Sequence, residues 1–328
     1  VKVAKEQLDK VTLTSRAFYN SVLGDWMEKL WKMTGKDMVL PMNTGAEAVE
    51  TALKTARRWG NFVKGVEDGK QEIIVCSNNF HGSTDPDARR GYGPFTPGFK
   101  VIEYGNIEQL KASINENTVA FLAEPIQGEA GIIIPPEGFL KEASKVCKEN
   151  NVLFIADEVQ TGFARTGRMF ACDYENVVPD IYVLGKALGG GIIAVSAIAA
   201  NKDILNVFEP GSHGSTFGGN PLGAAVSIKA MEILVRDNYP KQAEEKGNYF
   251  MSKLREIKND DIVEIRGKGL LIGVEFKINA APYVKKLIEN GVLAKETHER
   301  TIRFAPPIVT TYEQLDDACE KIKKAFTK

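Results

Sequence analysis

The sequence has few of the residues that build metal, redox or disulfide sites. Its 328 residues include four cysteines and three histidines: Cys76, Cys147, Cys172, Cys319, His81, His213 and His298. The cysteines are far apart, show no Cys-x-x-Cys spacing and form no recognisable metal site with the histidines. Scattered free thiols in a chain of this length suit a reducing compartment, so we expect a cytoplasmic protein without a bound metal.

Long apolar runs and an excess of one charge are also missing. The best apolar run, at 192–200, has about half of the roughly 20 residues that a membrane span needs. The first residues, VKVAKEQLDK, lack the apolar core of a signal peptide. The net charge of −1 gives no electrostatic basis for binding nucleic acid or an anionic membrane. Because the chain opens on a helical pattern without an initiator methionine, we expect a further N-terminal segment.

The pattern that is present predicts an α/β protein. A hydrophobic share of 43% is ordinary for a globular chain, and the length exceeds what one core usually supports. Short β-branched runs alternate with amphipathic helical patterns, which indicates βαβ units and a mainly parallel sheet. The expected strands are 72–78, 119–126, 152–159, 180–186 and 195–201, and the expected helices include 46–60, 138–150 and 221–237.

The C-terminal part of the sequence has a different texture. Residues 262–277 read as two short strands around a Gly-x-Gly turn, and helical patterns follow at 281–290 and 312–326. We therefore predict a large cofactor-binding domain over 1–235, with an N-terminal helical segment, and a small α+β domain over 236–328.

Two charged residues stand at the ends of neighbouring predicted strands. Asp157 ends one apolar run and Lys186 ends the next, so both face the sheet edge where α/β enzymes bind ligands. A pyridoxal phosphate cofactor needs this pair: an amine to hold it as a Schiff base and an anion to keep its pyridine nitrogen protonated. Lys186 alone is also consistent with a lysine that ends a strand before the glycines of ALGGG.

Asp157 has one further interpretation, which the sequence disfavours. An acidic strand end also binds Mg²⁺ in nucleotide enzymes, but the phosphate loop G-x-x-x-x-G-K-[ST] is absent. Glu158 points to the opposite side if the strand geometry persists. Gln160, just beyond, is placed to contact a cofactor hydroxyl or is a plain loop residue.

Two glycine-containing segments are candidate phosphate sites. NTGAEA places Thr44, Gly45 and Ala46 at a helix start, where open N–H groups and the helix dipole bind phosphate. Thr44 also fits a capping box with Glu47, and both interpretations are compatible. Ser215 and Thr216 lie between glycines in HGSTFGGNP, which is otherwise a flexible turn.

Three more motifs carry residues suited to a ring or a carboxylate. Phe80 and His81 follow a strand in NNFHG, where an aromatic ring stacks on a flat cofactor or packs in the core. Glu124 and Glu129 lie in EPIQGEAG. Arg303, in TIRFAPP, is half of a structural ion pair or a fork for a substrate carboxylate.

Taken together, these motifs resemble one enzyme family over nearly the whole chain. NTGAEA, NNFHG, EPIQGEAG, FIADEVQTG, RTGRMFA, YVLGKALGGG, HGSTFGGNP and RFAPP occur in the order found in class III (subgroup II) aminotransferases, most like the bacterial-type ornithine aminotransferases. The resemblance implies a fold type I homodimer with pyridoxal 5′-phosphate at the subunit interface. It implies δ-amino transfer from ornithine to 2-oxoglutarate, and its nearest alternative is acetylornithine aminotransferase. A PLP aminomutase or decarboxylase and a non-catalytic cofactor-binding relic remain further alternatives.

The resemblance also assigns roles to individual residues. Lys186 matches the Schiff-base lysine, Asp157 the partner of the pyridine nitrogen, Gln160 the residue near the cofactor hydroxyl and Phe80 the stacking aromatic. Gly45 and Ala46 match the phosphate cup, and Ser215 and Thr216 match phosphate ligands donated by the neighbouring subunit. Arg303 matches the arginine that holds the α-carboxylate of glutamate, and Glu129 the acid that masks it during the ornithine half-reaction.

The sequence departs from the family pattern in two places. His81-Gly82 runs straight into Ser83-Thr84-Asp85, where the family has Arg-Thr and a further stretch. The chain also begins after the family's N-terminal segment, whose aromatic residues contact substrate. Both departures concern substrate binding and leave the cofactor residues intact.

Overall fold

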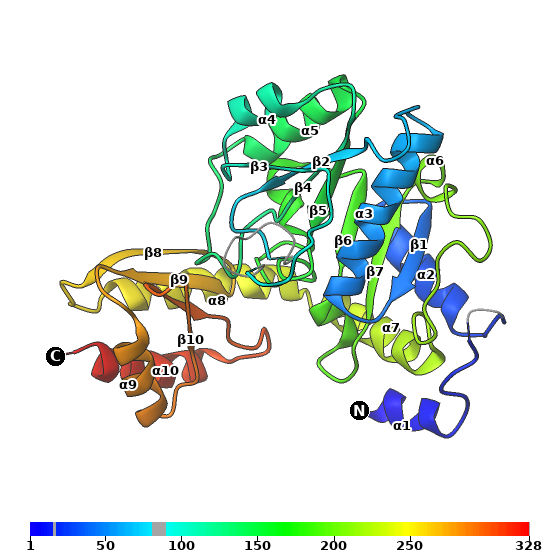
Figure 1. The fold of residues 1–328 in the computed structure, drawn as a ribbon. Helices are drawn as coiled ribbons and strands as arrows, with labels where there is room; N and C mark the ends of the chain where they lie inside the picture. The colour runs from blue at the N-terminus through cyan, green and yellow to red at the C-terminus, as the bar shows by residue number, and fades with distance from the viewer. Residues whose placement is uncertain (16–17, 81–89, 328) are drawn as a thin grey trace. The chain divides into compact units, whose positions relative to one another are not determined.

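The protein, described here from a computed structural model, folds as two compact units (Figure 1). The structure describes residues 1–15, 18–80 and 90–327. The first unit comprises Val1–Pro125, Pro135–Gln160 and Cys172–Arg236. The second comprises Ile126–Ile134, Thr161–Ala171 and Asp237–Lys328, so two short segments from the middle of the chain join its C-terminal part.

A seven-stranded sheet forms the centre of the first unit, in the order β1-β7-β6-β5-β4-β2-β3. The strands are β1 (Met38–Met42), β2 (Glu72–Cys76), β3 (Phe99–Ile102), β4 (Thr118–Ala123), β5 (Leu153–Asp157), β6 (Ile181–Leu184) and β7 (Ser196–Ala200). The neighbours from β6 to β3 pair in parallel, whereas β7 is antiparallel to both β6 and β1. The predicted mainly parallel sheet is confirmed, and β1 and β3 were not predicted.

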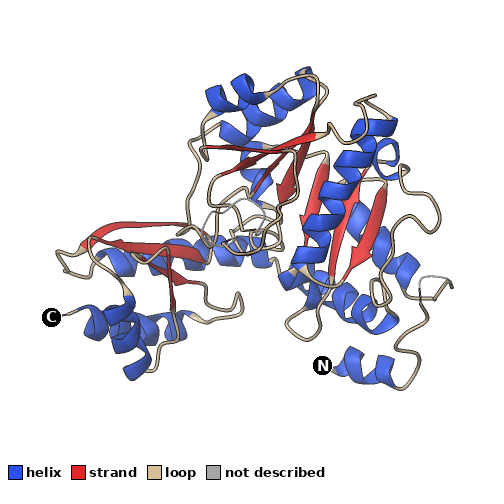
Figure 2. Ribbon diagram, in the orientation of Figure 1, coloured by secondary structure: helices blue, strands red, loops and turns tan. Residues whose placement is uncertain are grey.

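Helices cover both faces of this sheet (Figure 2). Successive side chains of a strand point to opposite faces, so an apolar strand between two helical layers is buried throughout. In β5, Ile155 packs with the helix α3 (Gly45–Phe62), and Ala156 packs with α5 (Phe139–Glu149). Both β5 and β6 are buried along their whole length, and the first charged side chain of each segment comes at the carboxyl edge of the sheet.

The remaining helices of the first unit lie around this core. They are α1 (Lys2–Leu8), α2 (Leu23–Thr34), α4 (Ile107–Ser113), α6 (Lys202–Leu205) and α7 (Pro221–Arg236). The α2 and α7 helices are joined by a buried hydrogen bond, in which the Trp26 indole N–H donates to the Ser227 hydroxyl at 2.7 Å. Among the described residues, none of the helices combines the length and apolar character that a bilayer span requires.

The second unit contains an antiparallel sheet of four strands in the order β10-β11-β9-β8. Its elements are α8 (Tyr239–Arg255), β8 (Ile262–Lys268), β9 (Leu271–Phe276), α9 (Ala281–Glu289), β10 (Lys295–Thr297), β11 (Thr301–Phe304) and α10 (Tyr312–Phe326). Phe276, Tyr283 and Phe326 pack as one aromatic group in its core. The predicted strand pair, the following helix and the terminal helix are confirmed, whereas α8 and β10 were not predicted.

One glycine in α8 is required by a close backbone approach. A Cβ added at Gly247 would lie 1.9 Å from the carbonyl oxygen of Gly269 in the turn between β8 and β9. Gly247→Ala therefore destabilises the protein by about 1–3 kcal/mol in urea unfolding, although alanine alone favours a helix by about 1 kcal/mol. Gly24→Ala in α2, where nothing lies within 4 Å of the new Cβ, is the matched control and should not destabilise. Equal stabilities of the two variants would contradict this packing.

Candidate active site

Lys186 follows the end of β6 in an unusual backbone conformation. After Leu184 and the extended Gly185, Lys186 has a φ of 45° and starts a short 3₁₀ turn, Lys186–Gly189. A left-handed conformation in a residue other than glycine costs on the order of 1 kcal/mol and concentrates at functional sites. The side chain is exposed, so an amine stands at the carboxyl edge of the sheet.

Asp157, the last residue of β5, is a buried carboxylate beside this lysine. Its partner on the neighbouring parallel strand is Val183, three residues before Lys186. Burial raises the pKa of the Asp157 carboxyl to about 6, against the opposing effects of a hydrogen bond from the Val159 N–H and of the positive charge of Lys186. The structure therefore brings the two charged groups within electrostatic reach.

The next carboxylate, Glu158, has different surroundings. It is fully buried, and its Oε1 accepts a hydrogen bond from the Cys172 N–H at 2.9 Å. The Glu158 N–H itself donates to the Val183 carbonyl at 3.0 Å. Asp157 and Glu158 thus make separate contacts, as the alternation of strand side chains predicts.

Val159 connects three parts of the site and was missed by the sequence analysis. Its N–H donates to Asp157 Oδ1 at 3.0 Å. A Cβ added at Gly45 would lie 2.9 Å from Val159 Cγ1, and one added at Gly185 would lie 3.3 Å from the same atom. The valine side chain therefore packs against the start of α3 and against the residue before Lys186, which requires small residues at both positions.

The N-terminus of α3 has a complete capping box. The Glu47 N–H donates to Thr44 Oγ1 at 3.2 Å, and the Thr44 N–H donates to Glu47 Oε2 at 2.7 Å. These hydrogen bonds, with others from Asn43, lower the pKa of the Glu47 carboxyl although burial opposes them. The predicted cap is confirmed.

The capping box leaves the first two amides of α3 open. Among the described residues, no acceptor is found for the N–H groups of Gly45 and Ala46. Unpaired N–H groups at the positive end of an 18-residue helix form an anion site without any basic side chain. The chemistry predicted for these residues fits this geometry.

Ser215 lies next to the start of α3 in the same chain. Its hydroxyl accepts hydrogen bonds from Asn43 Nδ2 and from the Gly218 N–H, each at 3.0 Å. Thr216 is exposed. The prediction that Ser215 and Thr216 serve the neighbouring subunit stays a prediction.

Three other residues predicted to bind the cofactor are Phe80, Gln160 and His81. Phe80 is 65% exposed, and its backbone N–H donates to Oε1 of the buried Glu124 at 3.0 Å. Gln160 is half-buried in the turn after β5. His81 lies outside the described residues, as do Gly82 and the first residues of the segment that departs from the family pattern.

The second unit holds the predicted carboxylate-binding pair. Arg303 in β11 and Glu129 in the segment Ile126–Ile134 form a salt bridge between Nη1 and Oε1, and their side chains are only 18% and 20% exposed. Burial alone would raise the pKa of Glu129, but the hydrogen bond and charge of Arg303, and the nearby Lys295, lower it overall. The guanidinium of Arg303 is thus held by an acid of its own unit.

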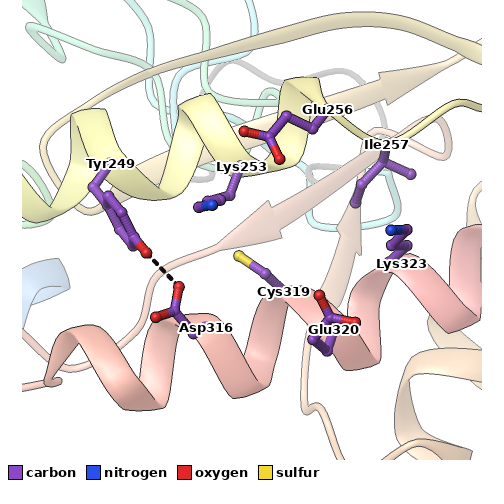
Figure 3. Close-up of a pocket in the computed structure, with 8 residues that line it drawn as sticks. All are labelled: Tyr249, Lys253, Glu256, Ile257, Asp316, Cys319, Glu320 and Lys323. Carbon is purple, nitrogen blue, oxygen red and sulfur yellow. Dashed lines mark hydrogen bonds between the residues drawn. The ribbon is translucent and has the colours of Figure 1, made fainter.

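A cavity elsewhere in the second unit lacks comparable chemistry (Figure 3). It encloses about 290 Å³ between α8 and α10 and is lined by Tyr249, Lys253, Glu256, Ile257, Asp316, Cys319, Glu320 and Lys323. Tyr249 donates a hydrogen bond to Asp316, and burial raises the pKa of the Cys319 thiol to about 11. A thiol with this pKa is protonated at neutral pH and is a poor nucleophile.

The buried carboxylate makes a pH-dependent prediction for the protein without added ligand. With a folded-state pKa of about 6 and an unfolded value near 3.8, Asp157 favours the folded state below pH 4, and this contribution is lost as the pH rises through 6. Asp157→Asn should therefore leave the free energy of unfolding nearly unchanged at pH 4 and raise it by roughly 3 kcal/mol at pH 7.5.

Urea unfolding at the two pH values measures this difference. Asp68→Asn, in an exposed turn, is the matched control and should change stability little at either pH. Equal effects of Asp157→Asn at both pH values would show that the carboxyl is not perturbed by burial.

Comparisons with known proteins agree with this geometry. A model of the class-III aminotransferases matches residues 1–326. An ornithine aminotransferase of Geobacillus sp. (strain WCH70) is 62% identical over 334 residues, covering 99% of this chain and 84% of that protein. A structure of the Toxoplasma gondii ornithine aminotransferase with partial occupancy of PLP has a TM-score of 0.97 at 44% identity, covering 99% of this chain and 81% of that chain. An acetylornithine aminotransferase from Elizabethkingia anophelis has a TM-score of 0.91 at 50% identity, covering 99% and 84%.

These likenesses extend over almost the whole chain and include both of its sheets. They confirm the predicted α/β architecture of fold type I, with a large mixed sheet and a smaller antiparallel one. The chain belongs to the class-III aminotransferase family.

Proposed function

We propose that the protein is an ornithine aminotransferase that transfers the δ-amino group of L-ornithine to 2-oxoglutarate with pyridoxal phosphate. The products would be glutamate 5-semialdehyde and glutamate. The observation that carries the proposal is the pairing of a buried carboxylate, Asp157, with an exposed amine, Lys186, at the carboxyl edge of the sheet. The name of the 62% identical relative supports the choice of substrate.

The residues present fit this cofactor in three respects. Asp157 is buried with one hydrogen-bond donor described, the Val159 N–H, and the charge of Lys186 offsets only part of the cost of its burial, so a protonated pyridine nitrogen would supply a further cation. The open amides of Gly45 and Ala46 would bind the phosphate. Lys186 would hold the aldehyde carbon through its amine, Gln160 would contact the ring hydroxyl and Phe80 would stack on the ring.

The chemistry divides between the cofactor and the chain. When bound, pyridoxal phosphate supplies an electron sink for the carbon that carries the substrate's amino group. Lys186 would also serve as the general base, with its Nζ taking a proton from the same carbon. Asp157 would keep its negative charge beside the protonated pyridine nitrogen, and this pairing would offset the cost of burying the carboxylate.

The ion pair of Glu129 and Arg303 would let one site accept both ornithine and the dicarboxylate substrates. Glutamate and 2-oxoglutarate carry an α-carboxylate. Once the Arg303 guanidinium has separated from Glu129, it would bind this carboxylate with two parallel hydrogen bonds. Ornithine reacts through its δ-amino group, with no carboxylate beside the reacting carbon, and so tolerates an arginine that Glu129 still neutralises.

An acetylornithine aminotransferase is the second candidate. It is favoured by one specific observation, the 50% identity to the solved acetylornithine enzyme from Elizabethkingia anophelis. Assays of ornithine and N-acetylornithine as alternative donors to 2-oxoglutarate separate the two proposals. A faster reaction with the acetylated donor would replace the first with the second.

We also propose the assembly and the compartment that the family resemblance implies. Two copies would form a homodimer in which Ser215 and Thr216 complete the phosphate site of the neighbouring subunit. The protein would act in the cytoplasm on small-molecule donors and acceptors. The domain division at 235/236 is kept as part of this proposal.

Lys186→Ala should abolish amino transfer, because the chain loses both the amine that holds the cofactor and the general base. We expect kcat to fall by at least about 10²–10⁴-fold. Borohydride reduction followed by mass spectrometry should label the Lys186 peptide of the parent protein and leave the variant unlabelled. Lys202→Ala, at the start of α6, is the control. An active, labelled Lys186→Ala protein would refute the assignment.

Glu129→Gln should favour the dicarboxylate substrates. Without the carboxylate charge, the Arg303 guanidinium is released more easily, so we expect the KM for 2-oxoglutarate to fall about tenfold. Discrimination in favour of the δ-amino group of ornithine should also weaken. Glu275→Gln, which alters the pair between Arg266 and Glu275 in the same sheet, is the matched control. An unchanged or higher KM in Glu129→Gln would contradict the masking role.

A further inference from the structure

Glu129 has a second cation that the sequence analysis did not identify. Lys295 Nζ lies 3.4 Å from Glu129 Oε2, while Arg303 binds the other oxygen, Oε1. Lys295 in β10 and Arg303 in β11 are direct partners in the antiparallel register. The carboxylate of Glu129 therefore lies between two cations on adjacent strands, with one oxygen toward each.

This arrangement needs an anion between the two strands. Like charges directly opposite each other on neighbouring strands repel and destabilise a sheet. Glu129 offsets that repulsion in the resting protein. When a substrate carboxylate takes its place on Arg303, two anions and two cations are present, so each anion can have a cation of its own.

The backbone around Glu129 is held in place, so only its side chain is free to move. The segment is closed by a pair of hydrogen bonds between Gln127 and Ile133, at 3.0 and 2.9 Å. The Thr297 hydroxyl donates to the Glu129 carbonyl, and Arg266 donates to the Gly131 carbonyl at 2.7 Å. Glu129 must therefore leave Arg303 by rotation about its side-chain bonds, and Lys295 is the cation already within reach.

We propose that Lys295 is a positioning residue for substrate choice: it receives the Glu129 carboxylate when Arg303 binds the α-carboxylate of glutamate or 2-oxoglutarate. The inference rests on the proposed function. Lys295 would lower the free-energy cost of replacing Glu129 by a substrate carboxylate on Arg303. The Glu129 carboxylate would pass from one cation to another and would keep a partner throughout.

The effect requires Lys295 to hold Glu129 more strongly after the exchange than before it. In the resting protein Lys295 touches one carboxylate oxygen at 3.4 Å, and Arg303 competes for the same group. The lysine side chain is 67% exposed on a flexible stem, so it can follow the carboxylate and take both oxygens once Arg303 has turned to the substrate. In the resting protein the Glu129 side chain is only 20% exposed. Without Lys295, the released carboxylate would have no second cation beside it, and a poorly solvated carboxylate without a partner is costly.

The test is Lys295→Met, which keeps the length of the side chain and removes its charge. In single half-reactions, the KM for 2-oxoglutarate and for glutamate should rise about three- to fivefold, the size expected for an exposed ion pair. The KM for ornithine and the kcat of both half-reactions should change less than about twofold. Lys295→Arg should restore the parent values.

Lys321→Met is the matched control, because it also removes an exposed lysine from a carboxylate pair, with Asp317, in the same unit. It should leave all constants at the parent values. An unchanged KM for the dicarboxylates in Lys295→Met, in a parent protein that uses both substrates, would overturn the inference and leave the proposed function standing. A parent protein that does not react with ornithine would instead refute the proposed function.

The double variant Glu129→Gln/Lys295→Met identifies how the lysine acts. If Lys295 acts by receiving Glu129, its removal should have no further effect once residue 129 is neutral. A three- to fivefold rise in the KM for 2-oxoglutarate that persists in the Glu129→Gln background would mean that Lys295 binds the substrate directly, and would overturn the proposal.

Discussion

The candidate active site depends on one carboxylate, Asp157, which is buried where the central strand β5 ends. It has few partners to offset the cost of its burial. Burial raises the pKa of Asp157. One backbone N–H and the charge of Lys186 lower that pKa, but only in part. Such a group lowers the stability of the protein that carries it at neutral pH. Under the proposed function, the protonated ring of the cofactor would supply a cation beside Asp157, and the surrounding groups of the first unit would bind the rest of that cofactor.

Val159 shows how the fold holds these groups together. One residue donates the backbone hydrogen bond to Asp157 and packs its side chain against Gly45 and Gly185. Val159 therefore contacts the start of α3, the carboxylate of Asp157 and the residue before Lys186, all within the first unit. A larger residue at either glycine would separate them.

The second unit also contains a partly buried carboxylate whose charge is balanced by nearby cations. Glu129 is a half-buried anion between Arg303 and Lys295, and its charge is balanced in more than one way. A ligand carboxylate can take the place of Glu129 on Arg303, because Lys295 is still there to pair with Glu129. In an isolated ion pair, the same ligand would leave the displaced carboxylate without a cation. Under the proposed function, substrate choice would follow from which cation holds Glu129.

The sequence predicted those features that depend on local pattern and missed those that depend on register. Asp157 was placed correctly at the end of a strand, and Lys186 lies two residues beyond the end of β6, because continuous apolar runs mark buried strands. The strand β1 was missed because Pro41 lies within it, a residue tolerated there because β1 is an edge strand. The helix α8 was missed because its sequence is polar and interrupted by Gly247.

Contacts between distant segments had no signal in the sequence. Lys295 reaches Glu129 only because β10 pairs with β11 in one particular register, and Val159 meets Gly45 only through the packing of α3 on the sheet. The pairing of Glu129 with Arg303 came from the family resemblance and not from spacing. Spatial roles such as these require the folded chain.

The most direct measurement is the visible absorbance of the purified protein saturated with pyridoxal phosphate. A band from the lysine-bound cofactor should disappear when ornithine alone is added and return when 2-oxoglutarate follows. That cycle is expected if Lys186 and Asp157 act on one cofactor ring. A protein that shows no such band, or a band that ornithine does not change, would contradict the account.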